Sequence, residues 1–426
     1  MTSDSNLPDR PKLRSVEVSR VTHEGGEYFF LKDLRRLNDQ SLMVPVSMGL
    51  YLQGVDGTKT LNEITKAAIS GGAPEVTRET LYELISRLDD MLLLSNGKYS
   101  VEIEQRLDRY RSATERTPVL ADLAYPSDTD DLRCYLDGFA FPYMNDTAMS
   151  DNDFPDDVEL KAVVSPHIDF ERGGDSYGMI WEQVRDHIKD VELFVVFGTD
   201  HNGEGPRLTL TNQDYRTPLG MLDTDTELVD EIARILSTDS TVENHPFTDE
   251  FNHVNEHSIE LATVWLHRAI GSSDAKMVPI LCGSFGGLLE DDASDIDDHP
   301  EISGVIRLLQ SVAGERRTMF IAAGDLSHVG PAFGDTDLMP KESEDRRRVE
   351  AEDEVLMEAI VSGSRRSFFE AIRKNEDRNR ICGFAPIYMT MWAADTTIGT
   401  WNGYQQCQAD EEDTSFVSIA GAALFG

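Results

Sequence analysis

This 426-residue chain is poor in cysteine, in long apolar runs and in positive charge. Its four cysteines, Cys134, Cys282, Cys382 and Cys407, show no CxxC spacing, so no disulfide framework is predicted and the thiols are expected to be reduced. No segment approaches the roughly 20 apolar residues that cross a bilayer. The first residues also lack the basic and apolar stretches of a secretory signal. We therefore expect a soluble, cytoplasmic protein that makes no contact with a membrane.

Positive charge is scarce and unevenly placed. The chain holds 39 Lys+Arg against 78 Asp+Glu, which gives a formal net charge of −39. Residues 1–112 contain 15 basic and 17 acidic residues, which leaves 24 basic and 61 acidic residues, a net charge of −37, for residues 113–426. Such a field repels nucleic acid, because phosphates are bound by Lys and Arg. Nucleic-acid binding is therefore not expected, whereas solubility and adaptation to a salt-rich host both explain the acidity.

Length and composition predict a globular protein with two domains. Hydrophobic residues make up 40% of the chain, and 426 residues exceed one ordinary core. We predict a flexible tail over residues 1–20, a small α+β module over 21–102, a charged helical linker over 103–116 and a large domain over 117–426.

The small module is predicted to be a winged helix. Residues 27–31 read as a strand, while 61–69 and 79–92 read as helices, the second with apolar residues at helical spacing. The Asn96-Gly97 pair stands between two apolar stretches, which is a strong hairpin signal. The pattern resembles the small PqqD-like domains that present peptides to radical SAM enzymes. A docking or dimerisation module without chemistry is the alternative.

In the large domain, side chains of the metal-binding type follow apolar strands. They are His167 after residues 162–165, Asp200 and His201 after 193–199, and Asp325 and His328 after 319–323. Helices at 177–188 and 226–236 alternate with these strands and with others at 277–282 and 414–420. The predicted fold is therefore α/β, with a largely parallel sheet and helices on both faces. Ligands of such sheets gather outside the carboxyl ends of the strands, so a metal-centred site is predicted at that edge.

Imidazole is the commonest side-chain metal ligand, so His167 and His201 are the first candidates for ligands. Asp200 could orient the neighbouring His201 ring through a hydrogen bond. Asp325 and His328 are three residues apart, a spacing that places both on one face of a helical turn, where they can bind metal or transfer protons. Alternatively, Asp325 is a helix N-cap and His328 its packed neighbour.

Six motifs occur in an order that resembles the Memo family. They are Ser165-Pro166-His167, Gly198-Thr199-Asp200-His201, Tyr215-Arg216-Thr217-Pro218-Leu219-Gly220, Glu256-His257-Ser258-Ile259-Glu260, Gly324-Asp325-Leu326-Ser327-His328 and Ile381-Cys382-Gly383. The likeness covers roughly residues 117–426. It implies a fold like that of the class III extradiol dioxygenases and two kinds of partner, a radical SAM protein and an Ammecr-type protein.

The resemblance also implies roles for single residues. Cys382 becomes a third metal ligand beside His167 and His201, or a redox thiol. The resemblance places Asp325, His328 and His257 in the pocket as acid–base groups, and it makes Glu256 and Glu260 residues that orient or assist the groups of the site. Some relatives carry a His-Pro pair where this chain has Phe384-Ala385-Pro386, so no role of that histidine carries over.

The ligand types bear on the metal and the function. Two histidines with a thiolate favour copper(I) or zinc, whereas two histidines with a carboxylate suit ferrous iron. We expect iron or copper as cofactor, with zinc as the alternative. Three functions fit: a redox or dioxygenase-like enzyme, a hydrolase in which zinc-bound water attacks a carbonyl, and a non-catalytic metal-binding partner of a radical SAM system whose amino-terminal module holds a peptide or protein.

Overall fold

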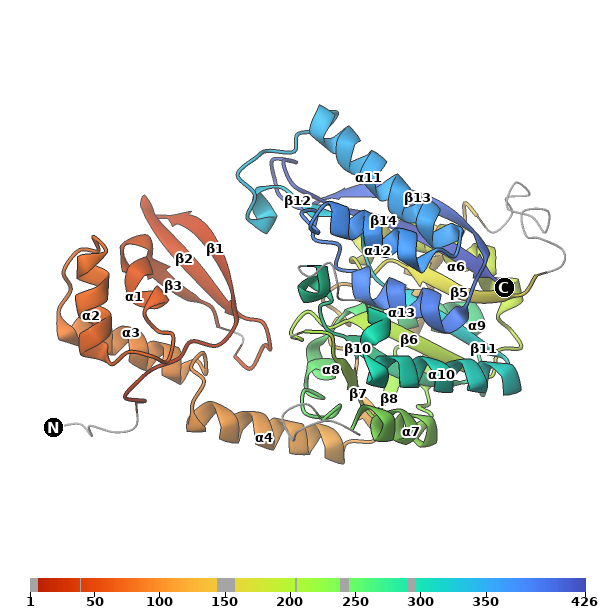
Figure 1. Cartoon of the computed structure of the whole chain (residues 1–426), viewed down its shortest axis with the longest axis horizontal. Coiled ribbons are helices and arrows are strands. Elements are labelled where there is room, and N and C mark those ends of the chain that lie inside the picture. The colour runs from red at the N-terminus through yellow and green to blue at the C-terminus, as the bar shows by residue number, and fades with distance from the viewer. Residues whose placement is uncertain (1–6, 39, 144–157, 204, 238–244, 290–295) are drawn as a thin grey trace. The chain divides into compact units, whose positions relative to one another are not determined.

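The computed structural model describes residues 7–38, 40–143, 158–203, 205–237, 245–289 and 296–426. The chain divides into two compact units, unit 1 (Met1–Ser112) and unit 2 (Ala113–Gly426) (Figure 1). The first six residues of the predicted tail lie outside the described residues. Among the helices that are described, none is both long enough and apolar enough to span a membrane.

Unit 1 combines a three-stranded antiparallel sheet with helices. Its elements are β1 (Val16–His23), β2 (Gly26–Asp33), β3 (Leu42–Pro45), η1 (Val46–Met48), α1 (Gly49–Gln53), α2 (Leu61–Ser70), α3 (Arg78–Asp90) and α4 (Gly97–Ser112). The strands pair in the order β1-β2-β3. Leu31 and Val44 of the sheet share one buried core with Ile64 and Leu88 of the helices. The strand predicted over residues 27–31 and the helices predicted over 61–69 and 79–92 are confirmed as β2, α2 and α3.

Two features of unit 1 differ from the prediction. Asn96 does not turn a hairpin, because its Oδ1 accepts the N–H of Tyr99 at 3.0 Å and α4 begins at the next residue. Asparagine is favoured both in hairpin turns and at helix N-caps, and here the amphipathic stretch that follows decides for the cap. Strand β1 begins at Val16, inside the predicted tail. The sheet therefore precedes the helices, and α4 extends from the module through most of the predicted linker.

Unit 2 is an α/β unit built on a mixed sheet of eight strands. Its elements are β4 (Glu115–Arg116), α5 (Thr129–Ala140), β5 (Leu160–Ser165), α6 (Phe170–Val184), η3 (Arg185–His187), β6 (Leu193–Thr199), β7 (Leu208–Leu210), β8 (Asp214–Thr217), β9 (Gly220–Leu222), α7 (Thr226–Leu236), α8 (Asn252–Asn255), α9 (Ser258–Ile270), β10 (Lys276–Cys282), η5 (Gly286–Leu289), η6 (Ile296–Asp298), α10 (Pro300–Glu315), β11 (Thr318–Ala323), β12 (His328–Val329), η7 (Pro331–Phe333), α11 (Glu344–Val361), α12 (Arg365–Lys374), α13 (Phe384–Ala394), β13 (Ile398–Gln408) and β14 (Phe416–Phe425). The main sheet has the order β12-β14-β5-β11-β6-β10-β7, and β13 pairs with β14. A small sheet joins β4, β8 and β9.

Only the centre of the main sheet is parallel. Strands β5, β11, β6 and β10 lie in this order and run parallel to one another. The pairs β14/β5, β13/β14, β12/β14 and β10/β7 are antiparallel. A parallel partner needs a long crossover, and β13 and β14 are joined by a short connection that permits only an antiparallel pair. The predicted largely parallel sheet is therefore corrected to a parallel centre with antiparallel flanks.

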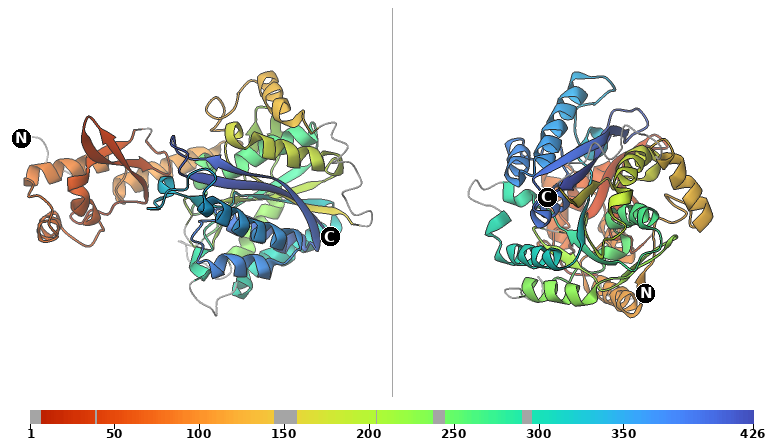
Figure 2. Two further views of the ribbon diagram at one scale, coloured as in Figure 1. Left: turned by 90° about the horizontal axis from the view of Figure 1, so that it is seen from above. Right: turned by 90° about the vertical axis from the view of Figure 1, so that its right-hand side faces the viewer.

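Helices cover both faces of this sheet, as predicted (Figure 2). Along β6, Val195 and Phe197 pack into a core shared with α7, α10, α11 and α13. The alternate residues Phe194 and Val196 pack into a second core shared with α5, α6 and α9. This alternation follows from the two-residue period of a strand, and burial on both faces explains why the predicted strands read as continuous apolar runs.

Candidate metal centre

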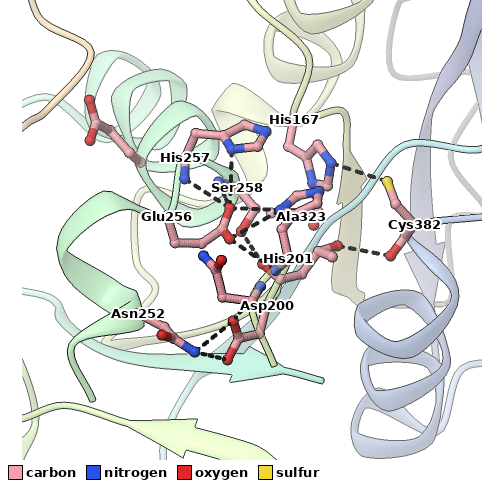
Figure 3. A network of polar contacts seen from close by, with 12 residues as sticks. His167, Asp200, His201, Asn252, Glu256, His257, Ser258, Ala323 and Cys382 are labelled. Atoms are coloured by element: carbon pink, nitrogen blue, oxygen red, sulfur yellow. Dashed lines mark hydrogen bonds and ion pairs between the residues drawn. The ribbon is translucent and has the colours of Figure 1, made fainter. Parts of the chain in front are cut away.

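Three adjacent parallel strands bring the predicted residues to one edge of the sheet. His167, His201 and Asp325 each follow the end of β5, β6 or β11 by two residues. His257 is the N-cap of α9, and its ring lies beside those of His167 and His201 (Figure 3). The His167 ring lies 5.2 Å from both the His201 and the His257 rings, whose own centroids are 4.7 Å apart. His167 is buried, whereas the side chains of His201 and His257 are 34% and 38% exposed. The cluster is therefore open to solvent on the side of His201 and His257.

Each imidazole of this cluster uses Nδ1 to contact a protein acceptor. His167 Nδ1 donates to the carbonyl of Ala323 at 3.0 Å. His201 Nδ1 lies 3.0 and 3.1 Å from the two oxygens of Glu256, and His257 Nδ1 lies 3.2 Å from Glu256 Oε1. Proton donation from Nδ1 leaves Nε2 with a free lone pair, which is the arrangement of a metal-ligating histidine. One ligand atom from each of the three rings lies within 4.8 Å of the others, so these histidines form a possible metal site.

Glu256 organises two of the three rings. Its buried carboxylate also accepts the backbone N–H groups of His201, His257 and Ser258, at 3.1, 2.8 and 3.0 Å. Burial would raise the pKa of Glu256, but the two imidazoles beside it hold the pKa well below its usual range. Burial likewise works against a charged His201, and the Glu256 carboxylate reverses this and raises the His201 pKa.

Cys382 and Asp325 form a second group of possible ligands around His167. One ligand atom each of His167, Asp325 and Cys382 lies within 4.8 Å of the others. Cys382 Sγ lies 3.2 Å from His167 Nε2, and Asp325 Oδ2 lies 3.7 Å from the same nitrogen. Burial disfavours a thiolate, but the neighbouring imidazoles outweigh it and lower the Cys382 pKa well below its usual value. The two groups share His167, so both can serve one ion.

Asp325 also holds the loops of the site together. Its Oδ1 accepts the His167 N–H at 2.7 Å, and its carbonyl accepts the Gly383 N–H at 2.9 Å. Residues 324–327 form no helix, and His328 begins β12, so the predicted helical turn is wrong. His328 pairs with Val417 of β14 and stacks edge-on against Phe333, with ring centroids 5.1 Å apart. Burial would lower the pKa of His328, but the nearby Cys382 thiol and the Asp325 carboxylate raise it.

Asp200 has a different environment from the one predicted. Its carboxylate accepts two hydrogen bonds from Asn252 Nδ2, both at 3.0 Å, and one from the Asn202 N–H at 3.1 Å. Burial raises the pKa of Asp200 to about 6. The carboxylate that holds the His201 ring is that of Glu256, which is distant in sequence, and Asp200 instead fixes the loop that follows β6.

Glu260 contacts the beginning of unit 2 rather than the histidines. It forms a buried ion pair with Arg116, and its oxygens accept the N–H groups of Val119 and Leu120 at 2.9 and 2.8 Å. Arg116 in turn donates to the carbonyl of Glu256 at 2.9 Å. Sequence patterns gave no sign that Arg116 is buried, because its acidic partner lies 144 positions along the chain.

Comparison with known proteins identifies relatives of the whole chain. The sequence model of a family described as "Memo-like protein" matches residues 116–423. A "MEMO1 family protein" of Aquifex aeolicus is 21% identical over 422 residues, which cover 98% of this chain and all of the relative. Proteins with the same description from Nitrosopumilus maritimus and Archaeoglobus fulgidus are each 25% identical, over 73% and 65% of this chain and 99% and 86% of their own lengths. The Aquifex alignment covers 98% of this chain and therefore includes unit 1.

Proposed function

This chain belongs to the Memo-like protein family, and we propose that unit 2 binds one transition-metal ion through His167, His201 and Cys382 and supports redox chemistry on a small substrate. The observation that carries the proposal is the hydrogen bonding of the three clustered imidazoles. Each ring has Nδ1 in contact with an oxygen acceptor, so Nε2 is the nitrogen left for a ligand.

The donor set suits a soft or borderline transition metal. Two imidazoles and a thiol whose pKa is lowered fit copper(I), iron(II) or zinc better than magnesium or calcium, which prefer oxygen ligands. Bound iron or copper would supply one-electron and dioxygen chemistry to a substrate. The exposed side of the cluster, beside His201 and His257, is where a substrate can enter.

The remaining polar groups would orient the ligands and transfer protons. His257 lies on the exposed side, so its Nε2 could give a proton to a bound substrate or accept one. Asp325 and His328 are the other candidates for proton transfer, because Asp325 Oδ2 lies 3.7 Å from His167 Nε2 and Cys382 raises the His328 pKa. Glu256 keeps the His201 ring in the tautomer that ligation requires.

The test is metal content per folded chain after anaerobic purification. About one iron or copper per chain is expected, because the site has one set of convergent ligands. His167→Ala and His201→Ala should abolish stoichiometric binding, whereas Cys134→Ser, at an exposed cysteine, should not. Full occupancy in both histidine variants would overturn the proposal. Full zinc occupancy with indifference to iron and copper would reject its redox part.

Zinc-dependent hydrolysis is a second candidate, because a group of three histidines is a known donor set of catalytic zinc. In that case His257 is a ligand and Cys382 is dispensable. Cys382→Ser separates the two candidates. The variant should lose its metal if Cys382 is a ligand of the redox site, and should keep it if the three histidines hold zinc. Metal analysis of this variant decides between them.

For unit 1 we propose a partner-binding role in a system with a radical SAM protein and an Ammecr-type protein. Two observations favour it: the possible ligand groups found among the described residues all lie in unit 2, and the Aquifex alignment extends through unit 1. Co-purification of the full chain with the radical SAM and Ammecr-type proteins of the same genome tests it. If a chain that lacks residues 1–112 recovers the partner proteins equally well, unit 1 does not make the contact with them.

A further inference from the structure

Asp353, on α11, is a buried carboxylate whose hydrogen-bond partners among the described residues are all neutral hydroxyl groups. It is 0% exposed. Ser327 Oγ donates to its Oδ1 at 2.6 Å, while Ser418 Oγ and Tyr404 OH donate to its Oδ2 at 2.6 and 2.9 Å. Burial raises the pKa of Asp353 to about 6 against the effect of these hydrogen bonds. A carboxylate in such a position is costly, and an apolar side chain would pack α11 against the sheet without that cost.

The two serine hydroxyls that Asp353 binds belong to two segments, the 324–328 loop and β14, that are already joined by their backbones. The Ser418 N–H donates to the Ser327 carbonyl at 2.8 Å, and the Leu326 N–H donates to the Ser418 carbonyl at 2.9 Å. The Ser327 N–H donates to Ser418 Oγ at 2.8 Å. Asp353 therefore clamps the loop of residues 324–328 to β14, with one carboxylate oxygen on each segment.

This loop carries Asp325, which contacts both sides of the candidate metal centre. Its Oδ1 accepts the backbone N–H of His167 at 2.7 Å, and its carbonyl accepts the Gly383 N–H at 2.9 Å. The same carbonyl lies 3.7 Å from Cys382 Sγ. A shift of the loop would therefore change the distance between the His167 imidazole and the Cys382 thiol.

A neighbouring residue of α11 supports the same region through a second connection. Glu352 Oε2 accepts from Asn379 Nδ2 at 2.8 Å, and the Asn379 carbonyl accepts the His328 N–H at 2.7 Å. Helix α11 thus holds both ends of the segment from Ser327 to His328. None of these α11 side chains belongs to the possible ligand groups.

We propose that Asp353 is a positioning residue of the metal centre, which it serves by fixing the 324–328 loop so that His167, Asp325 and Cys382 converge on one point. This inference rests on the proposed metal-binding function. It assigns a role to a residue that touches neither metal nor substrate and that lies outside the six motifs that characterise the chain.

Four variants of the full chain test the proposal. Asp353→Asn keeps the shape of the side chain but replaces one acceptor oxygen by a donor, so it cannot accept from both serines and Tyr404. Ser327→Ala removes the contact to the loop. Tyr404→Phe removes a hydrogen bond to the same carboxylate without touching the loop, and Ser176→Ala removes a buried hydroxyl whose partner is Gly403.

The probe is Co²⁺ added to metal-free protein, followed through its visible absorption, including the charge-transfer band of a cobalt–thiolate bond. For Asp353→Asn we expect an affinity lowered about 10- to 100-fold and an altered spectrum, because loss of an orienting contact typically has an effect of this size. Ser327→Ala should show the same spectral change. Tyr404→Phe and Ser176→Ala should lower the melting temperature and leave affinity and spectrum as in wild type.

A second measurement does not depend on metal. Amide hydrogen exchange of Leu326 and Ser327 in the metal-free protein should be faster in Asp353→Asn than in Tyr404→Phe. If Asp353→Asn does not fold, Ser327→Ala decides alone. An unchanged affinity and spectrum together with a lowered melting temperature would overturn the positioning role and leave the metal site standing. Failure of wild type to bind Co²⁺ would instead overturn the proposed function, and this inference with it.

Discussion

Two regions of unit 2 use histidine in opposite ways. His253, on α8, is fully buried and both of its ring nitrogens have partners: Nε2 donates to the Thr209 carbonyl at 2.9 Å, and Nδ1 accepts from Tyr215 OH at 2.7 Å. In the cluster at the sheet edge, Nδ1 of His201 and Nδ1 of His257 both contact the Glu256 carboxylate. The comparison teaches that a ring nitrogen close to other ligand-type atoms, rather than burial, distinguishes a candidate ligand from a structural histidine.

The electrostatic surroundings of His253 and His201 also differ. Burial lowers the pKa of His253 to about 3, so this ring is neutral and structural at any ordinary pH. Beside His201, the Glu256 carboxylate outweighs burial and raises the pKa. A carboxylate that attracts a proton to an imidazole also favours a metal cation at the other nitrogen.

The contrast between the two histidine regions would be refuted most clearly if substitution of the candidate ligands left metal affinity unchanged. His201→Ala and Cys382→Ser should each lower the affinity for iron or copper by more than about 100-fold, because a site with so few ligands cannot replace one. His253→Ala should retain the metal of wild type. Titration of metal into metal-free protein measures the affinity of each variant, and thermal melts confirm that each one is folded. His245→Ala serves as the control at an exposed histidine.

A smaller effect is expected when the residue that holds the rings is changed. Glu256→Gln should lower metal affinity about 10- to 100-fold, since an amide cannot replace a carboxylate that accepts from two rings and three N–H groups. Glu182→Gln is the matched control, because Glu182 is a buried carboxylate whose partners are Arg185 and Arg268. Equal loss of affinity in both variants would mean that general destabilisation, rather than ring orientation, is responsible.

His253 should matter for stability and not for metal. His253→Ala should lower the free energy of unfolding by about 2–4 kcal/mol, because it leaves a cavity and removes the partners of Tyr215 OH and the Thr209 carbonyl. Urea denaturation measures the loss, with metal content determined on the same sample. A metal-depleted but stable variant would reverse the assignment of the two regions.

The last expected effect concerns pH. The folded pKa of His253 is about 3, whereas an unfolded histidine titrates near 6.5. Its contribution to stability is complete above about pH 6.5 and is lost as pH falls toward 3, by up to roughly 1.4 kcal/mol per unit, because only the unfolded chain binds the proton. The difference in unfolding free energy between wild type and His253→Ala should therefore shrink between pH 6.5 and 4. A constant difference would show that His253 does not titrate in this way.

The sequence was most informative where the chain is regular. The strands that precede His167, His201 and Asp325 are continuous apolar runs, and all three were predicted within one or two residues. Ambiguous signals caused the errors: Asn96 suits a hairpin and a helix cap equally, and the spacing of Asp325 and His328 fits a helical turn that residues 324–327 do not form. The amphipathic stretch after Asn96 decides the first case, whereas contacts of the 324–328 loop with distant segments decide the second.

The sequence by itself determined the alternation of strands and helices, the edge of the sheet at which His167, His201 and Asp325 emerge, and the concentration of negative charge in residues 113–426. These follow from periodicity and composition, which are local properties. Only the tertiary structure decided that Glu256 rather than Asp200 holds His201, that Arg116 anchors Glu260, and that Asp353 clamps the loop of Asp325. Such contacts join residues 26 to 144 positions apart, and no periodicity along the chain encodes which of many carboxylates meets a given partner.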